Sequence, residues 1–155
     1  MRHVVTGLAA ALIASLLASP LAAPASAQGA DPLAALKGEK RIVLLFSKSR
    51  SLAALDRQEA EFRERRPDVR ERDMVVFTVP GSDPVQDAIG YERLPYGATR
   101  ALRRRYAPEG TGLTVVLIGK DGGEKARWER AVDPDEVFAL IDAMPMRQRE
   151  MREGS

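Results

Sequence analysis

Five consecutive residues, Ser47-Lys48-Ser49-Arg50-Ser51, place three hydroxyl groups and two positive charges directly after an apolar run. A serine beside a lysine can act as a nucleophile and its base, whereas basic side chains at the start of a helix suit a carboxylate, sulfate or phosphate. Adjacent residues on a loop are poorly placed to act as a nucleophile and its base, so the segment favours anion binding over catalysis. A helix capped by Ser49 or Ser51, with both basic side chains in water, is the simpler alternative.

Beyond its first residues the chain has no cysteine or histidine side chain that could carry out thiol or imidazole chemistry. The sequence has no cysteine, and its single histidine is His3. Disulfide exchange and peroxide reduction need a thiolate, and a serine hydroxyl does not ionise usefully at neutral pH. A Ser-His-Asp or Cys-His triad and the usual zinc, copper or haem sites are excluded for the same reason. We therefore expect no catalytic residue, no metal site and no cofactor.

The acidic residues have a structural explanation. Asp133 is placed to cap a helix, Pro134 suits its first turn, and Glu136 stands where a capping box needs a glutamate. A second group lies among arginines on one helical segment and is typical of an ion-paired, solvated face: Asp56, Glu59, Glu61 and Glu64. Neither group indicates a pair of catalytic carboxylates.

A cluster of arginines raises the question of nucleic-acid binding. At helical spacing Arg100, Arg103 and Arg104 share one face, which we expect to be exposed, while Leu102 and Tyr106 turn inward. The full chain carries 24 basic and 22 acidic residues, and such a balance is not the one-sided charge of a nucleic-acid-binding protein. We expect no nucleic-acid partner; an acidic partner or an anionic lipid head group is the alternative.

The elements that must position these residues follow from periodicity. Apolar runs at 41–46, 73–79 and 114–118 predict buried strands, and the Asp121-Gly122 turn predicts a hairpin to a fourth strand at 124–130. Helical patterns begin near residue 51 and end at Pro67, span 98–106, and run from 133 to about 145.

The resulting order, β-α-β-α-β-β-α, predicts an α/β fold. Two β-α-β steps imply parallel neighbours joined by right-handed crossovers, and the hairpin adds an antiparallel strand. This is the order of a thioredoxin-like domain, with a central mixed four-stranded sheet flanked by helices.

The segment G-L-T-V-V-L-I-G-K-D-G-G-E-K-A-R-W and the terminus V-D-P-D-E-V-F-A-L-I-D-A-M-P-M-R resemble the domain-of-unknown-function 4174 family of exported bacterial proteins. The resemblance implies a thioredoxin-like fold related to peroxiredoxins, here without the redox cysteines, and it implies no particular activity. It places the reactive position of such folds within residues 47–51 and their cis-proline at Thr114. Because a non-proline cis bond costs about 3 kcal/mol, we expect a trans peptide at Thr114, which puts a thioredoxin-style peptide groove in doubt.

The N-terminal segment predicts export. Arg2 and His3 precede an apolar run, Pro20 breaks it, and Ala25-Ser26-Ala27 offers small residues at a cleavage site. We expect residues 1–27 to be a signal peptide cut near Ala27-Gln28, and the mature protein to be periplasmic or secreted, with no later transmembrane segment. After the signal peptide we expect a flexible lead-in at 28–39, the thioredoxin-like domain at 40–145 and a frayed, charged tail at 146–155.

Together these features predict an exported, redox-inactive thioredoxin-like module that binds a protein or an anionic ligand in the cell envelope. The candidate ligand-binding residues are Ser47, Lys48, Ser49, Arg50, Ser51 and Thr114. The alternative is an oxidoreductase-related protein that acts only with a partner's thiol or a bound cofactor. The sequence does not decide the oligomeric state.

Overall fold

The computed structural model describes residues 31–49, 52–82, 84–90, 92–106 and 112–154. Its elements follow in the order η1 (Ala34–Leu36), β1 (Arg41–Phe46), α1 (Ala53–Glu64), α2 (Arg66–Glu71), β2 (Met74–Val79), β3 (Gln86–Asp87), α3 (Ala98–Tyr106), β4 (Thr114–Ile118), β5 (Glu124–Trp128), α4 (Pro134–Asp142) and α5 (Pro145–Glu153). The strands form a single mixed sheet in the order β3-β2-β1-β4-β5.

The sheet differs from the predicted one in two respects. It has five strands instead of four, because the two-residue strand β3 pairs antiparallel with β2 at the edge. Only the connection from β1 through α1 and α2 to β2 joins parallel neighbours; α3 leads instead to β4, which lies antiparallel to β1. The prediction of a second parallel step was wrong, because periodicity detects a strand but not its direction.

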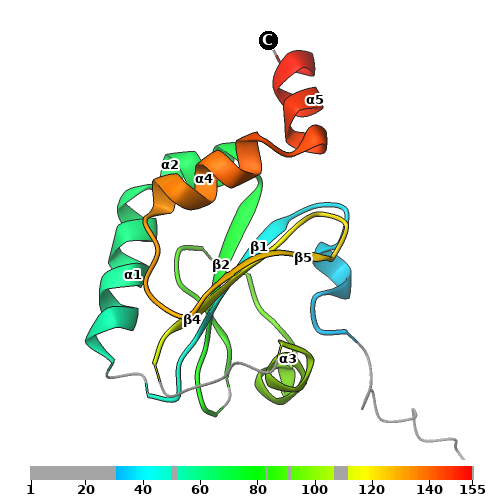
Figure 1. Cartoon of the computed structure of the whole chain (residues 1–155). Helices are drawn as coiled ribbons and strands as arrows, with labels where there is room; N and C mark the ends of the chain where they lie inside the picture. Colours follow the sequence, from blue (N-terminus) through cyan, green and yellow to red (C-terminus); the bar gives the residue numbers. More distant parts are fainter. Residues whose placement is uncertain (1–30, 50–51, 83, 91, 107–111, 155) are drawn as a thin grey trace, which may run out of the picture.

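Each face of the sheet buries its own apolar cluster, because successive side chains of a strand point to opposite sides. Val43 and Leu45 of β1 pack with residues of α1, α2 and α4, whereas Leu44 and Phe46 pack with α3 and with Leu33 of the lead-in. Figure 1 shows α1, α2 and α4 on one side of the sheet and α3 on the other. Strands β1, β2 and β4 are buried along their whole length.

The helical segment after β1 is divided in two. Helix α1 ends at Glu64, and α2 begins at Arg66 with Pro67 in its first turn. Proline is tolerated there because the first N–H groups of a helix have no intrahelical acceptor. Pro67 therefore helps to start a helix, where the sequence analysis expected it only to end one.

The C-terminal residues, expected to be frayed, form helix α5 beyond α4 (Figure 1). Arg147 is buried and donates to Asp142. Glu150 accepts two hydrogen bonds from Arg41, whose side chain is 1% exposed. The helix is attached chiefly by ion pairs instead of an apolar stripe, so hydrophobic periodicity gave no sign of it.

Candidate functional site

The predicted loop lies where β1 ends and α1 is about to begin. Ser47 is buried at 2% exposure, and Lys48 and Ser49 are exposed. Arg50 and Ser51, the other two residues of the predicted cluster, lie outside the described residues. The loop therefore offers the positive charge of Lys48 at the surface, and it keeps its first hydroxyl inside.

The hydroxyl of Ser47 is engaged by the loop itself. Its Oγ donates to the carbonyl of Ser49 at 2.6 Å and accepts from the Ser49 N–H at 3.3 Å. The N-cap position of α1 is taken by Leu52, which forms no side-chain cap. The side chain of Ser47 thus stabilises the loop, and its hydroxyl is not exposed as a nucleophile.

Arg103 of α3 holds this end of the sheet together. Its Nε donates to the carbonyl of Pro80 at 2.9 Å, and its Nη2 donates to the carbonyls of Ser47 and, at 3.2 Å, Val79. The guanidinium carbon also lies 5.8 Å from the centre of the Phe46 ring. Burial lowers the pKa of Arg103 from its ordinary value. One side chain therefore satisfies carbonyl oxygens at the ends of both β1 and β2.

Arg103 was predicted to share an exposed face with Arg100 and Arg104, and for Arg103 this prediction was wrong. Arg100 and Arg104 are exposed, whereas Arg103 is half-buried. In the structure Thr99, one helical turn before Arg103, is buried at 3% exposure, so the buried face of α3 extends to Arg103. Helical spacing alone does not predict the backbone carbonyl groups near the ends of β1 and β2 that accept hydrogen bonds from Arg103.

Gly81 permits the close approach of the two loops. A Cβ atom built on Gly81 would lie 2.9 Å from the carbonyl oxygen of Lys48, which is too close for an unstrained contact. The absence of a side chain therefore lets the loop after β2 rest against the loop after β1.

Thr114, the last predicted site residue, begins β4 directly opposite Phe46. It is 2% exposed, and its hydroxyl donates to Glu129 Oε2 at 2.7 Å. Thr114 thus lies close to the start of the Ser47 loop, but its hydroxyl donates to a carboxylate beyond β5.

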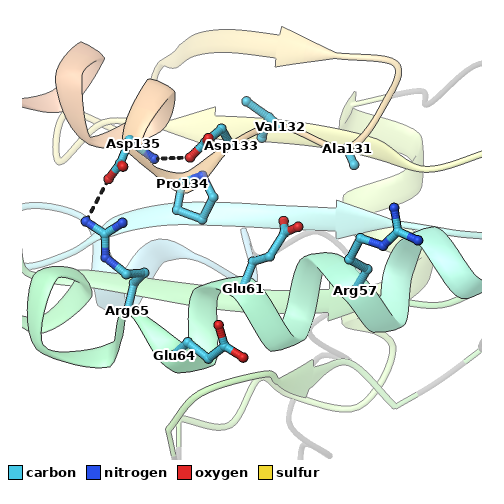
Figure 2. A pocket seen from close by; sticks show the side chains of 9 residues that line it. All are labelled: Arg57, Glu61, Glu64, Arg65, Ala131, Val132, Asp133, Pro134 and Asp135. Carbon is cyan, nitrogen blue, oxygen red and sulfur yellow. Dashed lines mark hydrogen bonds and ion pairs between the residues drawn. The ribbon is translucent and has the colours of Figure 1, made fainter.

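An open groove of about 460 Å³ lies between α1 and the segment that joins β5 to α4 (Figure 2). Figure 2 shows Arg65 and Arg57 toward opposite ends of the groove, with Glu61 between them. The lining residues are Arg57, Glu61 and Glu64 of α1, Arg65 between α1 and α2, and residues 131–135. No local sequence pattern predicts this groove, because its two walls are about 70 residues apart in the chain.

The groove has an excess of negative charge. Its lining includes two arginines and four carboxylates, and one arginine is neutralised because Arg65 Nη2 lies 2.6 Å from Asp135 Oδ1. The hydrogen bond from Arg65 holds the pKa of the Asp135 carboxyl below its ordinary value. Glu64 is exposed and forms no ion pair with any residue that the structure describes. The open part of the groove therefore suits a positively charged group.

Gln58 fixes the two walls of the groove relative to each other. It is fully buried, its Nε2 donates to the carbonyl of Val132 at 2.8 Å, and its Oε1 accepts from the Val132 N–H at 2.7 Å. The amide side chain thus pairs with the backbone as a neighbouring strand would. Its position between Leu55 and Phe62 on the buried stripe of α1 could have indicated that it points inward.

The capping of α4 follows the prediction only in part. The carboxylate of Asp133 accepts from the Asp135 N–H at 2.9 Å, which confirms the N-cap. Glu136 does not complete a capping box; its Oε1 accepts from Trp128 Nε1 at 2.7 Å instead. Trp128 is half-buried and packs against the core, so it is not an exposed anchor.

The described ranges of the chain contain neither a cluster of metal-ligating side chains nor a membrane-spanning helix. No group of three or more His, Cys, Asp or Glu side chains in these ranges could hold a metal ion. None of the helices in them combines the length and the apolar character needed to cross a membrane.

The mixed sheet, its helical layers and the hydrogen-bonded loop 47–49 at the end of β1 define a thioredoxin-like α/β protein. The sequence of this protein has no cysteine. The family described as Domain of unknown function (DUF4174) matches residues 32–150, and the chain belongs to it. The resemblance inferred from the sequence is thereby confirmed.

Solved structures with a similar fold include two peroxiredoxin-type proteins. The reduced 2-Cys peroxiredoxin of Plasmodium vivax superposes with a TM-score of 0.57 at 14% identity, over 76% of this chain and 72% of that one. Thioredoxin peroxidase I of Plasmodium yoelii gives a TM-score of 0.53 at 16% identity, over 76% of this chain and 79% of that one. Similarity at these identities concerns the fold. No curated protein sequence matches the chain.

Proposed function

We propose that this protein is an exported binding module that performs no thiol chemistry and holds a segment of a partner protein in the groove beside α1. The observation that carries the proposal is the state of the loop after β1. Where the resemblance places the reactive residue of such folds, Ser47 is buried and its hydroxyl is hydrogen-bonded to Ser49. A thioredoxin-like scaffold without that reactive group retains surfaces that can bind.

The groove supports a protein ligand of defined charge. Glu61 and Glu64, which form no ion pair with the described residues, attract lysine or arginine side chains, and Pro134 and Ala131 supply apolar surface near them. The two hydrogen bonds between Gln58 and the Val132 backbone hold both walls of the groove in place without a ligand. Binding therefore needs little ordering of the protein. A basic, extended segment is therefore the ligand that this surface fits best.

Export is supported by the N-terminal sequence alone. The apolar run, its basic start and the Ala25-Ser26-Ala27 motif have the order of a cleaved signal peptide. The chain would then meet its partner in the periplasm or outside the cell. Intact mass measurement of protein from the cell envelope tests this point, because the proposal expects a chain that begins near Gln28.

Photo-crosslinking in living cells tests the groove. A photoreactive residue at position 57, toward one end of the groove (Figure 2), should give one discrete adduct with a partner protein. The same residue at position 70, exposed on α2, serves as the control and should not give that adduct. Glu64→Lys should weaken the adduct by reversing a groove charge, and Glu153→Lys should leave it unchanged. Equal labelling from positions 57 and 70, or no adduct from either, would refute the proposal.

A further inference from the structure

The side of α3 that faces away from the sheet carries two arginines. Arg100 and Arg104 are four residues apart, so they lie on one face of the helix, and both are exposed. Leu102 and Tyr106, on the buried side of α3, pack in the apolar cluster of that face of the sheet. Neither arginine forms an ion pair or a hydrogen bond with any residue that the structure describes. Both charges are therefore available to a partner.

The stability of the helix does not explain these two positions. Arg100 stands in the first turn of α3, where the positive end of the helix dipole disfavours a cation, and this turn contains no acidic residue. Like charges four residues apart destabilise a helix as well. The arrangement lowers the stability of α3 unless an anionic partner neutralises it.

A third cation lies beside α3. Figure 1 shows α3 at the end of the sheet where β1 and β2 finish, and Arg103 donates there to the carbonyl of Ser47. Lys48, the next residue of this loop, is exposed and forms no ion pair with the described part of the chain. Positive charge from two distant segments therefore gathers at one end of the molecule.

An aromatic side chain stands in solvent just before α3. Tyr96 is 95% exposed, and Pro95 beside it is exposed as well. The Ala98 N–H donates to the Pro95 carbonyl at 3.1 Å, so a turn holds Tyr96 next to the first residues of α3. Tyrosine is enriched where a membrane meets water, because its ring is apolar and its hydroxyl group is polar.

We propose that the surface formed by Lys48, Tyr96, Arg100 and Arg104 docks the protein on a membrane that contains anionic lipid. The cations contact the lipid phosphates, and the ring of Tyr96 enters the head-group region. One basic residue near such a surface strengthens binding about fivefold, so three give about a hundredfold preference over a neutral bilayer. The contact is peripheral, because α3 buries its apolar side in the protein itself.

A membrane fits this surface better than a nucleic acid or an acidic protein. The cations lie on the outward side of a helix and on a loop beside it, and an exposed ring accompanies them. Export, which the N-terminal sequence predicts, would also place the protein next to a membrane. The groove beside α1 lies on the other side of the sheet, so this inference is independent of the proposed protein binding (Figure 1).

Co-sedimentation of the mature protein with lipid vesicles tests the inference; the apolar run within residues 1–27 would itself bind lipid. Vesicles of phosphatidylcholine with phosphatidylglycerol should bind the protein about a hundredfold more tightly than vesicles of phosphatidylcholine alone, and added salt should weaken this binding. The double variant Arg100→Gln/Arg104→Gln should bind about thirtyfold more weakly. Arg70→Gln/Arg149→Gln, an equal change of charge on α2 and α5, should bind as the wild type does.

A fluorescent label tests the position of Tyr96. Because the chain has no cysteine, Tyr96→Cys provides a single thiol for an environment-sensitive dye. Its emission should shift to the blue on vesicles with phosphatidylglycerol, and the emission of the same dye on Arg70→Cys should not shift.

Several results would overturn the inference. Equal binding to the two kinds of vesicle, or binding to neither, would exclude recognition of anionic lipid. Equal weakening by the two double variants would indicate an effect of net charge alone. An unshifted dye at position 96 on bound vesicles would remove Tyr96 from the contact. Binding to poly-glutamate in solution as tight as to the anionic vesicles would indicate an acidic protein partner instead of a membrane.

Discussion

At the scale of single residues, Arg103 shows how a surface helix stabilises the end of a sheet. Strands β1 and β2 end side by side, and the carbonyl groups of Ser47, Val79 and Pro80 lie at these ends within reach of α3. Arg103 donates to three of these carbonyls from α3. A guanidinium group suits this position because it presents several N–H donors in one plane.

Replacing Arg103 by alanine should lower the free energy of unfolding by about 2–3 kcal/mol, because carbonyl oxygens in a partly buried place lose their charged donor. Arg104→Ala, on the exposed side of the same helix, should change it by less than about 0.5 kcal/mol. Urea unfolding followed by circular dichroism measures both. Equal effects of the two substitutions would show that Arg103 is only a surface charge.

Single residues were predictable from the sequence where local chemistry decides their role. Asp133 caps α4 because its side chain reaches an N–H group two residues away. Arg103 and Gln58 bind acceptors that are 23 to 74 residues distant, so no local pattern could specify their partners. The loop at 47–49 was located correctly because it follows a strand with a clear apolar run.

At the scale of elements, α5 is held to the domain by charge. Glu150 contacts Arg41 at 3.0 Å and Lys120 at 2.8 Å, and Arg147 binds Asp142 and Glu71. Arg41 is almost completely buried, so its charge depends on these partners.

Glu150→Gln should lower the free energy of unfolding by about 1–2 kcal/mol at neutral pH, because buried Arg41 loses its carboxylate. We expect a smaller loss of unfolding free energy than for a fully buried ion pair, because Glu150 itself is 27% exposed. Glu153→Gln, on the exposed side of α5, is the matched control and should have little effect. A similar loss of stability in both variants would indicate a general effect of charge on the helix instead.

The same contact should respond to acid. Although burial alone would raise the pKa of Glu150, the hydrogen bond from Lys120 and the charge of Arg41 hold it below its ordinary value of 4.5. A lowered pKa in the folded state contributes stability above the unfolded-state value, and that stability is lost as pH falls through the folded-state value.

The difference in unfolding free energy between wild type and Glu150→Gln should therefore shrink as pH falls from about 5 toward 3, because a protonated glutamate resembles glutamine. Urea unfolding of both proteins over this pH range provides the measurement. A difference that stays constant, or grows, would exclude the charged contact as its cause.

Elements with apolar periodicity were predicted well. The bounds of α3 and β4 agree with the expected 98–106 and 114–118. The exceptions were the two-residue strand β3, which is too short to show alternation, and α5, whose attachment is polar. The direction of β4 was also missed, because pairing partners depend on contacts between distant segments.

At the scale of the whole molecule, the protein combines a thioredoxin-like scaffold with a sequence that has no thiol. Two apolar clusters, one on each face of the sheet, provide the packing that holds the fold together without a disulfide. The described residues also form an acidic groove on the α1 side of the sheet.

Peroxide consumption and insulin disulfide reduction by the purified mature protein, each with and without envelope extract, test the central claim most directly. We expect no rate above that of the buffer, or of the extract alone, because the loop after β1 contains a hydrogen-bonded serine where a thiolate would be required. Turnover by the protein alone would contradict it. So would turnover that requires both protein and extract and is lost in Ser47→Ala, since the loop would then act on a partner's thiol.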